Sequence, residues 1–254
     1  MLTPRVFFLH VPKTGGTWAT QALIAAGVPC RAVEIPSRNH YAEHGHVWLA
    51  DIVPDERLLS VAFVRHPLDW WRSVWAHRMR EGWLFPNHEI DSRASSTDFA
   101  EFVEMVIEHL PGFLDGFFER FTGPPERPIA FVGRFERLVD DLVLALRLAG
   151  EPFDEVALRT HPPQNVGTYD RFAASYDPEL ARALAISEQR TIDRFYAGEV
   201  VPTCFLPIDK GRRATRAHAI TRSPRRLGEL QPQRGIISAR SYSRSLTCSS
   251  QPAP

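Results

Sequence analysis

Two segments of the chain share one order: an apolar run of strand length, a loop carrying a positive charge, and a run of helical composition. The first run, RVFFLHV, ends at Pro12, and after two glycines the segment TWATQALIAAG stops at Gly27. The second, RLLSVAFVRHP, leads into PLDWWRSVWAHRMREG. Continuous short apolar runs are typical of strands buried on both faces of a parallel sheet, and parallel strands need crossover connections, usually helical. The order predicts an α/β fold, with a central parallel sheet flanked by helices.

The rest of the chain continues this alternation. A weak strand is expected around RAVEI, and PIAFVGRFERLVDDLVLALRLAG predicts a further strand and a helix that ends at Gly150. Within residues 84–128, STDFAEFVEMVIEHL predicts a capped amphipathic helix, which we expect to cover a substrate cleft. DPELARALAISEQRTIDRFYAG predicts a last helix, from a cap at Asp177 to a stop at Gly198.

The composition changes near residue 210. Residues 211–254 hold nine arginines and one acidic residue, Glu229, and are rich in serine and proline without apolar periodicity. Such a segment cannot bury enough apolar surface to fold, so we expect one domain over 1–210 and a disordered basic tail over 211–254. The tail could bind an anionic surface or nucleic acid, but we expect it to be solvated and expect no nucleic-acid partner. The oligomeric state is left open.

Cysteine content and hydropathy bear on the compartment. Cys30, Cys204 and Cys248 are far apart in the sequence and lack neighbours at metal-ligand spacing, so we expect free thiols in a reducing compartment. The beginning of the chain does not read as a secretory leader, and there is no apolar run of about 18 residues. We therefore expect a cytoplasmic protein without a transmembrane segment.

The first loop, PKTGGT, has the chemistry of a phosphate site. The chain contains only two lysines, Lys13 and Lys210, so lysine at position 13 stands out against a background of arginine. A glycine-containing loop before a helix offers backbone N–H groups and the positive helix end to an anion. An ammonium, being a compact point charge, suits a tight loop better than the planar guanidinium of arginine. The order differs from a Walker loop, GxxxxGK[ST], in which lysine follows the glycines.

PKTGGTW resembles the 5′-phosphosulfate loop of the sulfotransferases that use 3′-phosphoadenosine 5′-phosphosulfate as donor. FVRHPLDWWRSVW resembles the 3′-phosphate segment of that family, with Arg65 at a strand end and Ser73 eight positions later. The resemblance covers roughly residues 5 to 200, with the middle poorly matched, and FVGRFERLVDDL and DRFYAG also resemble carbohydrate-type members. It implies a P-loop-like nucleotide-binding sulfotransferase fold. It also implies that Trp18 stacks on adenine and that the 5′-phosphosulfate is wrapped by Lys13, Thr14, Gly15, Gly16 and Thr17.

The general base is assigned by a further resemblance. EHGHV is similar to the HGHV segment of the heparan sulfate and uronyl 2-O-sulfotransferases, in which both histidines serve the active site. His44 is therefore the first candidate for the base, His46 the second, and Glu43 the third, because other members use a glutamate nearby. A solvated loop is the alternative, and the HxH pair is a weak metal motif without a third ligand, so no metal is expected. Two further histidines, His10 and His66, are expected to be structural.

These features together predict transfer of a sulfuryl group to an acceptor hydroxyl, with Lys13 stabilising charge on the leaving 3′,5′-bisphosphate. The match to carbohydrate-type members indicates a saccharide, glycolipid or other glycosylated acceptor. Two alternatives stay open: a P-loop-type nucleotide or small-molecule kinase, recognisable by magnesium-dependent ATP turnover, and a nucleotide-binding protein without catalytic activity.

Overall fold

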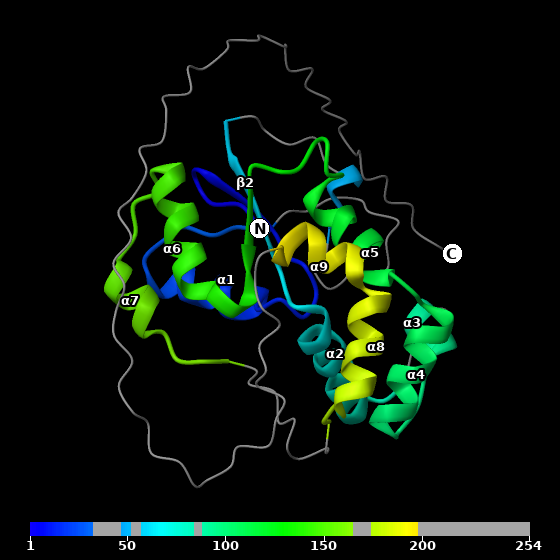
Figure 1. Cartoon of the computed structure of the whole chain (residues 1–254). Helices are drawn as coiled ribbons and strands as arrows, with labels where there is room; N and C mark the ends of the chain where they lie inside the picture. Colours follow the sequence, from blue (N-terminus) through cyan, green and yellow to red (C-terminus); the bar gives the residue numbers. More distant parts are fainter. Residues whose placement is uncertain (33–46, 52–56, 84–87, 165–173, 198–254) are drawn as a thin grey trace, which may run out of the picture. The chain divides into compact units, whose positions relative to one another are not determined.

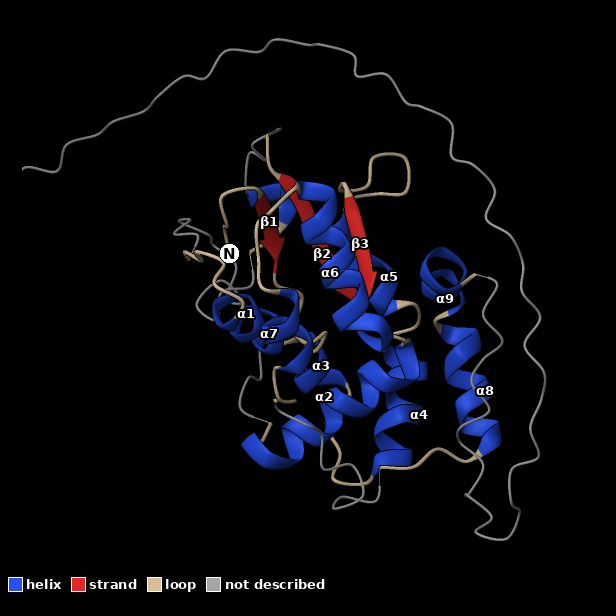
Figure 2. Cartoon of the chain, turned by 90° about the vertical axis from the view of Figure 1, so that its left-hand side faces the viewer, coloured by secondary structure: helices blue, strands red, loops and turns tan. Residues whose placement is uncertain are grey.

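The structure, a computed structural model, describes residues 1–32, 47–51, 57–83, 88–164 and 174–197. In these ranges the centre is a parallel sheet of three strands in the order β1 (Val6–Leu9), β2 (Leu59–Val64) and β3 (Phe131–Arg134) (Figures 1 and 2). In the register, Val6 lies opposite Leu59, and Val61 lies opposite Phe131. The predicted α/β fold with a central parallel sheet is confirmed at this level.

In the described ranges the structure contains the five predicted helices, the last of them divided in two, and three further helices that were not predicted. The helices are α1 (Gly16–Ala25), α2 (Pro67–Glu81), α3 (Glu89–Arg93), α4 (Phe99–His109), α5 (Phe113–Thr122), α6 (Leu138–Ala149), α7 (Glu155–Thr160), α8 (Pro178–Ser187) and α9 (Gln189–Tyr196), with 3-10 turns η2 (Leu49–Asp51) and η3 (Phe135–Arg137). Asp177 caps α8, as predicted, by accepting from the backbone N–H groups of Glu179 and Leu180. The prediction of one continuous final helix was wrong, because the chain breaks at Glu188 between α8 and α9.

Both faces of the sheet are covered, as expected for buried parallel strands. In β2, Val61 and Phe63 pack with α1, α6 and α7, whereas Ala62 and Val64 pack with α2, α4, α5, α8 and α9. Figure 1 shows these two groups of helices on opposite sides of β2. The second face is rich in aromatic residues, with Trp70, Trp71 and Trp75 of α2 all buried there. This packing fixes α2 against the sheet, and α2 carries several candidate site residues.

Other predictions concern parts of the chain at or beyond the limits of the described ranges. Of the weak strand at RAVEI, Arg31 forms an isolated bridge with Leu2, and residues 33–35 lie outside the description. The predicted tail 211–254, Cys204 and Cys248 also lie outside it. Cys30 is a free thiol. Among the helices that the structure describes, none is long and apolar enough to cross a membrane.

Candidate functional site

The loop between β1 and α1 is held by hydrogen bonds to three consecutive carbonyl oxygens. The donors are Thr14 Oγ1 to Val11 O at 2.9 Å, Trp70 Nε1 to Pro12 O at 2.9 Å, and Arg65 Nη1 to Lys13 O at 3.2 Å. Two of these donors come from the segment after β2, so the carboxyl ends of β1 and β2 are tied together. The first helical bond of α1 joins Ala19 N to Gly15 O, so the preceding N–H groups of the first turn have no partner within the helix.

The two glycines of the loop serve different purposes. Gly15 has φ 84°, in the left-handed region, and caps the start of α1. Gly16 needs its hydrogen for space: a Cβ there would lie 1.9 Å from Cδ2 of His10. The His10 ring, at the end of β1, therefore packs directly against the loop at Gly16.

Lys13 occupies a conformation that is costly for a residue with a side chain. Its φ is 65°, the only positive value at a non-glycine residue in the described ranges. Burial, helped by the charges of Arg80, Arg65 and Arg78, lowers the pKa of the Lys13 ammonium to about 8, against a smaller opposing effect of Glu81. Within the described ranges no carboxylate forms an ion pair with it. A left-handed residue costs about 1–2 kcal/mol, so the loop holds a strained and incompletely compensated cation.

Arg65 follows directly after β2 and reaches the same loop. Its side chain is buried, and its guanidinium lies 4.0 Å from the centroid of the Phe135 ring while Nη1 bonds the Lys13 carbonyl. Ser73, half-buried, lies on α2 three residues after Trp70, whose indole holds Pro12. Residues three apart share a helix face, so the structure brings Lys13, Arg65 and the Ser73 side of α2 together.

Three residues that the resemblance assigns to donor binding, Thr14, Thr17 and Trp18, differ in their exposure. Thr17 is exposed, whereas the hydroxyl of Thr14 is buried and turned toward Val11. The Trp18 indole is 8% exposed; it donates to the Pro162 carbonyl at 3.2 Å and packs in the core beneath α1. The reason is the buried stripe of α1, to which Trp18 belongs together with Ala19 and Ala22. The structure therefore buries the indole to which adenine stacking was assigned.

The candidate bases His44, His46 and Glu43 lie outside the described residues. Val47, the residue after His46, lines a cavity of about 340 Å³ along β1, and His10 and Thr20 line the same cavity. The end of the EHGHV segment is therefore placed beside β1, on the side where His10 meets the glycine loop.

Sequence reasoning missed the residues after β3 that position Arg65 and α2. Phe135 packs on the Arg65 guanidinium. Glu136 accepts from the backbone N–H of His66 at 2.8 Å and from the Tyr196 hydroxyl at 3.0 Å, and the His66 ring contacts the Tyr196 ring edge-on at 5.1 Å. The sequence does contain a sign of this role: an aromatic residue and a carboxylate follow the third apolar strand, at the sheet edge where the carboxyl ends of the strands meet.

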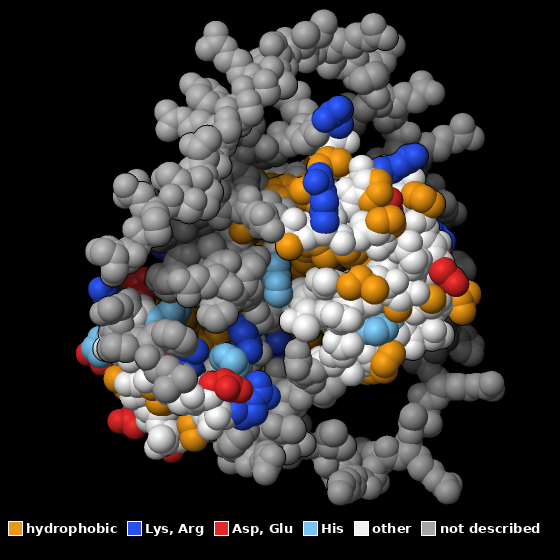
Figure 3. Space-filling model, turned by 180° about the vertical axis from the view of Figure 1, so that it is seen from behind, with side chains coloured by type: hydrophobic (Ala, Val, Ile, Leu, Met, Phe, Trp, Pro, Cys, Tyr) orange, Lys and Arg blue, Asp and Glu red, His pale blue; other side chains and the backbone are white. Residues whose placement is uncertain are grey.

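Sequence reasoning also missed the basic second half of α2. Arg78 donates from Nε to Asp91 Oδ1 of α3 at 2.7 Å, and Arg80 is exposed. Burial, together with the charges of Lys13, Arg78 and Arg80, lowers the pKa of His77 to about 4. Figure 3 shows Lys, Arg and His side chains close together in a hollowed part of one face. Lys13, Arg78 and Arg80 all act on His77, and Arg78 and Arg80 also act on Lys13, so these side chains form a mainly cationic cluster.

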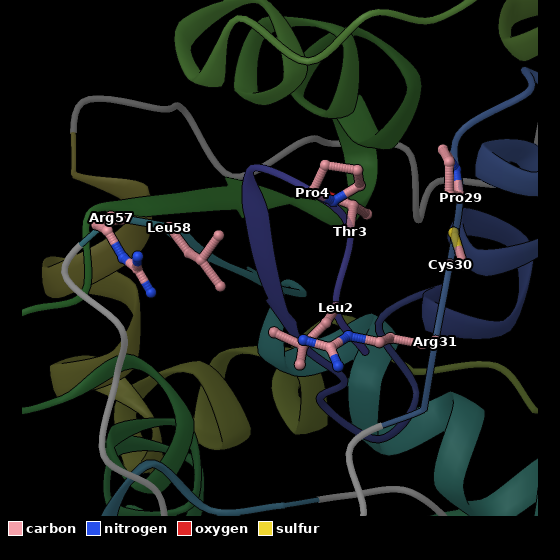
Figure 4. A pocket seen from close by; sticks show the side chains of 8 residues that line it. All are labelled: Leu2, Thr3, Pro4, Pro29, Cys30, Arg31, Arg57 and Leu58. Atoms are coloured by element: carbon pink, nitrogen blue, oxygen red, sulfur yellow. The ribbon is translucent and has the colours of Figure 1, made fainter. Parts of the chain in front are cut away.

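A second cavity lies away from this region. It has a volume of about 520 Å³ and is lined by residues at the amino ends of β1 and β2 and after α1: Leu2, Thr3, Pro4, Pro29, Cys30, Arg31, Arg57 and Leu58 (Figure 4). The loop of Lys13 follows the carboxyl end of β1, the end at which open parallel sheets bind ligands. This cavity therefore lies at the opposite ends of the strands from the Lys13 loop, although Cys30 and Arg31 also line the cavity of about 340 Å³.

No family model, characterised protein or solved structure matches this chain, so the functional assignment rests on the sequence and on the geometry of the site. In the ranges that the structure describes, no group of three His, Cys, Asp or Glu residues is arranged to hold a metal ion.

Proposed function

We propose that this chain is a sulfotransferase with a P-loop-like nucleotide-binding fold, which uses 3′-phosphoadenosine 5′-phosphosulfate to sulfate a hydroxyl group. The observation that carries the proposal is Lys13, a left-handed and half-buried lysine beside Arg65 with no described carboxylate to pair with. The left-handed conformation of Lys13 destabilises the free protein, and binding of a ligand to Lys13 would offset this strain. A phosphate is the ligand that best matches clustered cations and the free N–H groups of the first helical turn.

The donor would bind across the carboxyl ends of β1 and β2. Lys13 and the backbone N–H groups of Gly15, Gly16 and Thr17 would hold the 5′-phosphosulfate, and Arg65 and Ser73 would hold the 3′-phosphate. The hydrogen bond from Arg65 to the Lys13 carbonyl holds the guanidinium against the backbone of the loop before the donor arrives. Preorganised donors of this kind stabilise developing charge without reorganising during the reaction.

The reaction that this arrangement supports is a direct transfer. The acceptor oxygen forms a bond to sulfur, the bond from sulfur to the bridging phosphate oxygen breaks, and the leaving group is adenosine 3′,5′-bisphosphate. We assign His44 as the group that takes the hydroxyl proton, with His46 and Glu43 as alternatives. Lys13, mostly protonated at neutral pH because its pKa is about 8, would stabilise the charge that forms on the leaving oxygen.

The acceptor belongs to the same proposal. A saccharide, glycolipid or other glycosylated hydroxyl would enter beside β1, where the cavity of about 340 Å³ brings Val47 and His10 together. A cytoplasmic location is part of the proposal too, because a free thiol such as Cys30 stays reduced there.

The first experiment measures nucleotide binding. Adenosine 3′,5′-bisphosphate should raise the melting temperature well above the effect of adenosine 5′-monophosphate, because Arg65 then gains a phosphate partner. Arg65→Gln should remove this difference, while the control Arg182→Gln, an exposed arginine of α8, should preserve it. Equal stabilisation by both nucleotides would contradict the proposal, and magnesium-dependent stabilisation by ATP alone would favour the kinase alternative.

The second experiment measures transfer. Sulfuryl-labelled donor is offered with a panel of saccharides, glycolipids and phenols, with and without a magnesium chelator. Labelled saccharide or glycolipid, formed equally with the chelator, is the expected product. Tight binding of the bisphosphate without labelling of any acceptor would instead favour the non-catalytic nucleotide-binding alternative.

A further inference from the structure

One face of α2 continues the candidate site from the loop toward solvent. Trp70, Ser73, His77 and Arg80 are spaced by three, four and three residues, so they lie along one side of the helix. The indole of Trp70 bonds the Pro12 carbonyl and therefore turns this side toward the loop that carries Lys13. Exposure increases along the row: Trp70 is buried, Ser73 and His77 are half-buried, and Arg80 is exposed.

The charges around His77 are mainly positive. Lys13 from the loop and Arg78 and Arg80 from α2 act on the imidazole, and all three disfavour its protonation. On the α3 side the acidic group is Asp91, whose carboxylate is already bound by Arg78 Nε at 2.7 Å. Glu81 acts on Lys13 against the surrounding cations. Burial first, and these cations second, lower the pKa of His77, so in the free protein the imidazole is neutral near pH 7 and lies beside cations that would attract an anion.

We propose that His77 and Arg80 form, with Lys13, an anion subsite on α2 beyond Ser73, and that His77 takes up a proton from solvent when a phosphate or sulfate oxyanion binds there. The proposal rests on the proposed function only for the identity of the natural ligand, which would be the phosphosulfate end of the donor. The subsite itself follows from the position of α2 and from the charges around it.

The physical reason is compensation of charge. Burial is the first cause of the lowered pKa of His77 and the neighbouring cations the second; a bound oxyanion offsets the charges of Lys13 and Arg80 and adds a favourable neighbour for an imidazolium. The neutral imidazole then becomes a charged hydrogen-bond donor to the oxyanion, and such bonds are stronger than neutral ones. Binding should thus become tighter as the pH falls through the range between the pKa of free His77, about 4, and its ordinary value, 6.5.

The size of the effect follows from linkage. If the bound anion restores the pKa of His77 to its ordinary value of 6.5, from about 4 in the free protein, binding takes up roughly 0.9 proton at pH 5.5. The same shift makes binding roughly tenfold tighter at pH 5.5 than at pH 8, where His77 is neutral in both states. Lys13, whose pKa is also lowered, takes up its proton in a separate range above pH 7.

The experiment follows the His77 imidazole directly by NMR. The pH titration of the wild-type protein is recorded alone, with saturating sulfate, and with adenosine 3′,5′-bisphosphate; His77→Gln assigns the resonance. Sulfate does not titrate in this range, so a rise of at least one unit in the His77 pKa with sulfate supports the subsite. An unchanged His77 pKa with both probes overturns it.

Two variants test the role of the neighbouring charge. Arg80→Gln, at an exposed position that should not disturb folding, should raise the His77 pKa in the free protein and weaken sulfate binding. His77→Gln should lose about tenfold in affinity at pH 5.5 and little at pH 8. The control His109→Gln, at an exposed histidine of α4, should leave both pH dependences unchanged. Identical losses at the two pH values for His77→Gln would contradict the proton uptake.

The two proposals fail in different ways. A His77 pKa that rises with sulfate, together with no preference for the bisphosphate over the monophosphate, would retain the subsite and reject the donor assignment. A preference for the bisphosphate and sulfuryl transfer, with a His77 pKa that stays constant, would retain the sulfotransferase and reject the subsite.

Discussion

Replacing Gly16 with alanine tests whether the loop is shaped by its contact with His10. The added Cβ would lie 1.9 Å from Cδ2 and 2.2 Å from Nε2 of the His10 ring, far inside van der Waals contact. Either the ring or the start of α1 must therefore move. The ring lines the cavity along β1, and α1 begins at the loop that carries Lys13, so each movement also changes the candidate site.

The expected cost can be estimated from two opposing effects. Overpacking a filled site typically costs about 1–3 kcal/mol. Alanine gains up to about 1 kcal/mol over glycine in a helix, although less in the first turn, where Gly16 lies. Gly16→Ala should therefore lower the free energy of unfolding by about 1–2 kcal/mol. Gly116→Ala in α5 is the matched control: an added Cβ there meets nothing within 4 Å, so it should stabilise the protein by up to about 1 kcal/mol.

A double-mutant cycle separates the clash from other effects. The free energy of unfolding is measured by urea denaturation for wild type, Gly16→Ala, His10→Ala and the double variant. Gly16→Ala should cost at least 0.5 kcal/mol less when His10 is already alanine, which is a coupling typical of residues in contact. Additive effects, or a Gly16→Ala variant as stable as the wild type, would refute the reasoning, since the ring would then not define the loop.

Three further predictions concern the loop, the turn after β3 and a buried carboxyl group. Lys13→Gly relieves the left-handed strain at φ 65°, so urea denaturation should show a protein about 1 kcal/mol more stable that no longer binds the bisphosphate; lower stability would mean that Lys13 is structural. Glu136→Ala removes the hydrogen bonds that the carboxylate accepts from the His66 N–H and the Tyr196 hydroxyl and should cost about 1–3 kcal/mol, whereas Glu126→Ala, at a position that is exposed like Glu136, should cost little. Burial raises the pKa of Glu188 to about 7 against hydrogen bonds from neighbouring groups; the folded state therefore binds the proton more tightly than the unfolded state, and stability is lost as the pH rises from about 4.5 to 7. Relative to Glu188→Gln, the wild type should lose on the order of 3 kcal/mol over this range, and a constant difference would show that Glu188 does not titrate there.

The main elements near the site could be predicted because their signals are local. An unbroken apolar run marks each buried strand, a glycine loop or a proline marks each helix start, and the carboxyl ends of parallel strands meet at one edge. Lys13 and Arg65 each follow an apolar strand, and in the structure the Arg65 guanidinium donates a hydrogen bond to the Lys13 carbonyl at this edge.

Residues whose role depends on a distant partner could not be predicted in this way. Trp70 holds the Pro12 carbonyl across 58 positions, and Glu136 holds the His66 N–H across 70. The break between α8 and α9 has a similar origin: the Glu188 carboxylate accepts from the Trp71 indole at 3.0 Å and from the Leu114 N–H at 3.1 Å, so it serves two other helices. Helical periodicity continues through this position and gives no sign of the break.

The sequence by itself determined the three strands of the sheet, the main helices that follow them, the glycine loop and the presence of a cation within it, because each depends on neighbours a few residues away. The tertiary structure decided which way the side chains face. It turned Thr14 and Trp18 inward, set His10 against Gly16, and placed His77 among the charges of Lys13 and Arg80. Burial and electrostatic potential depend on segments that meet only after folding, so the chemical state of the site follows from the fold.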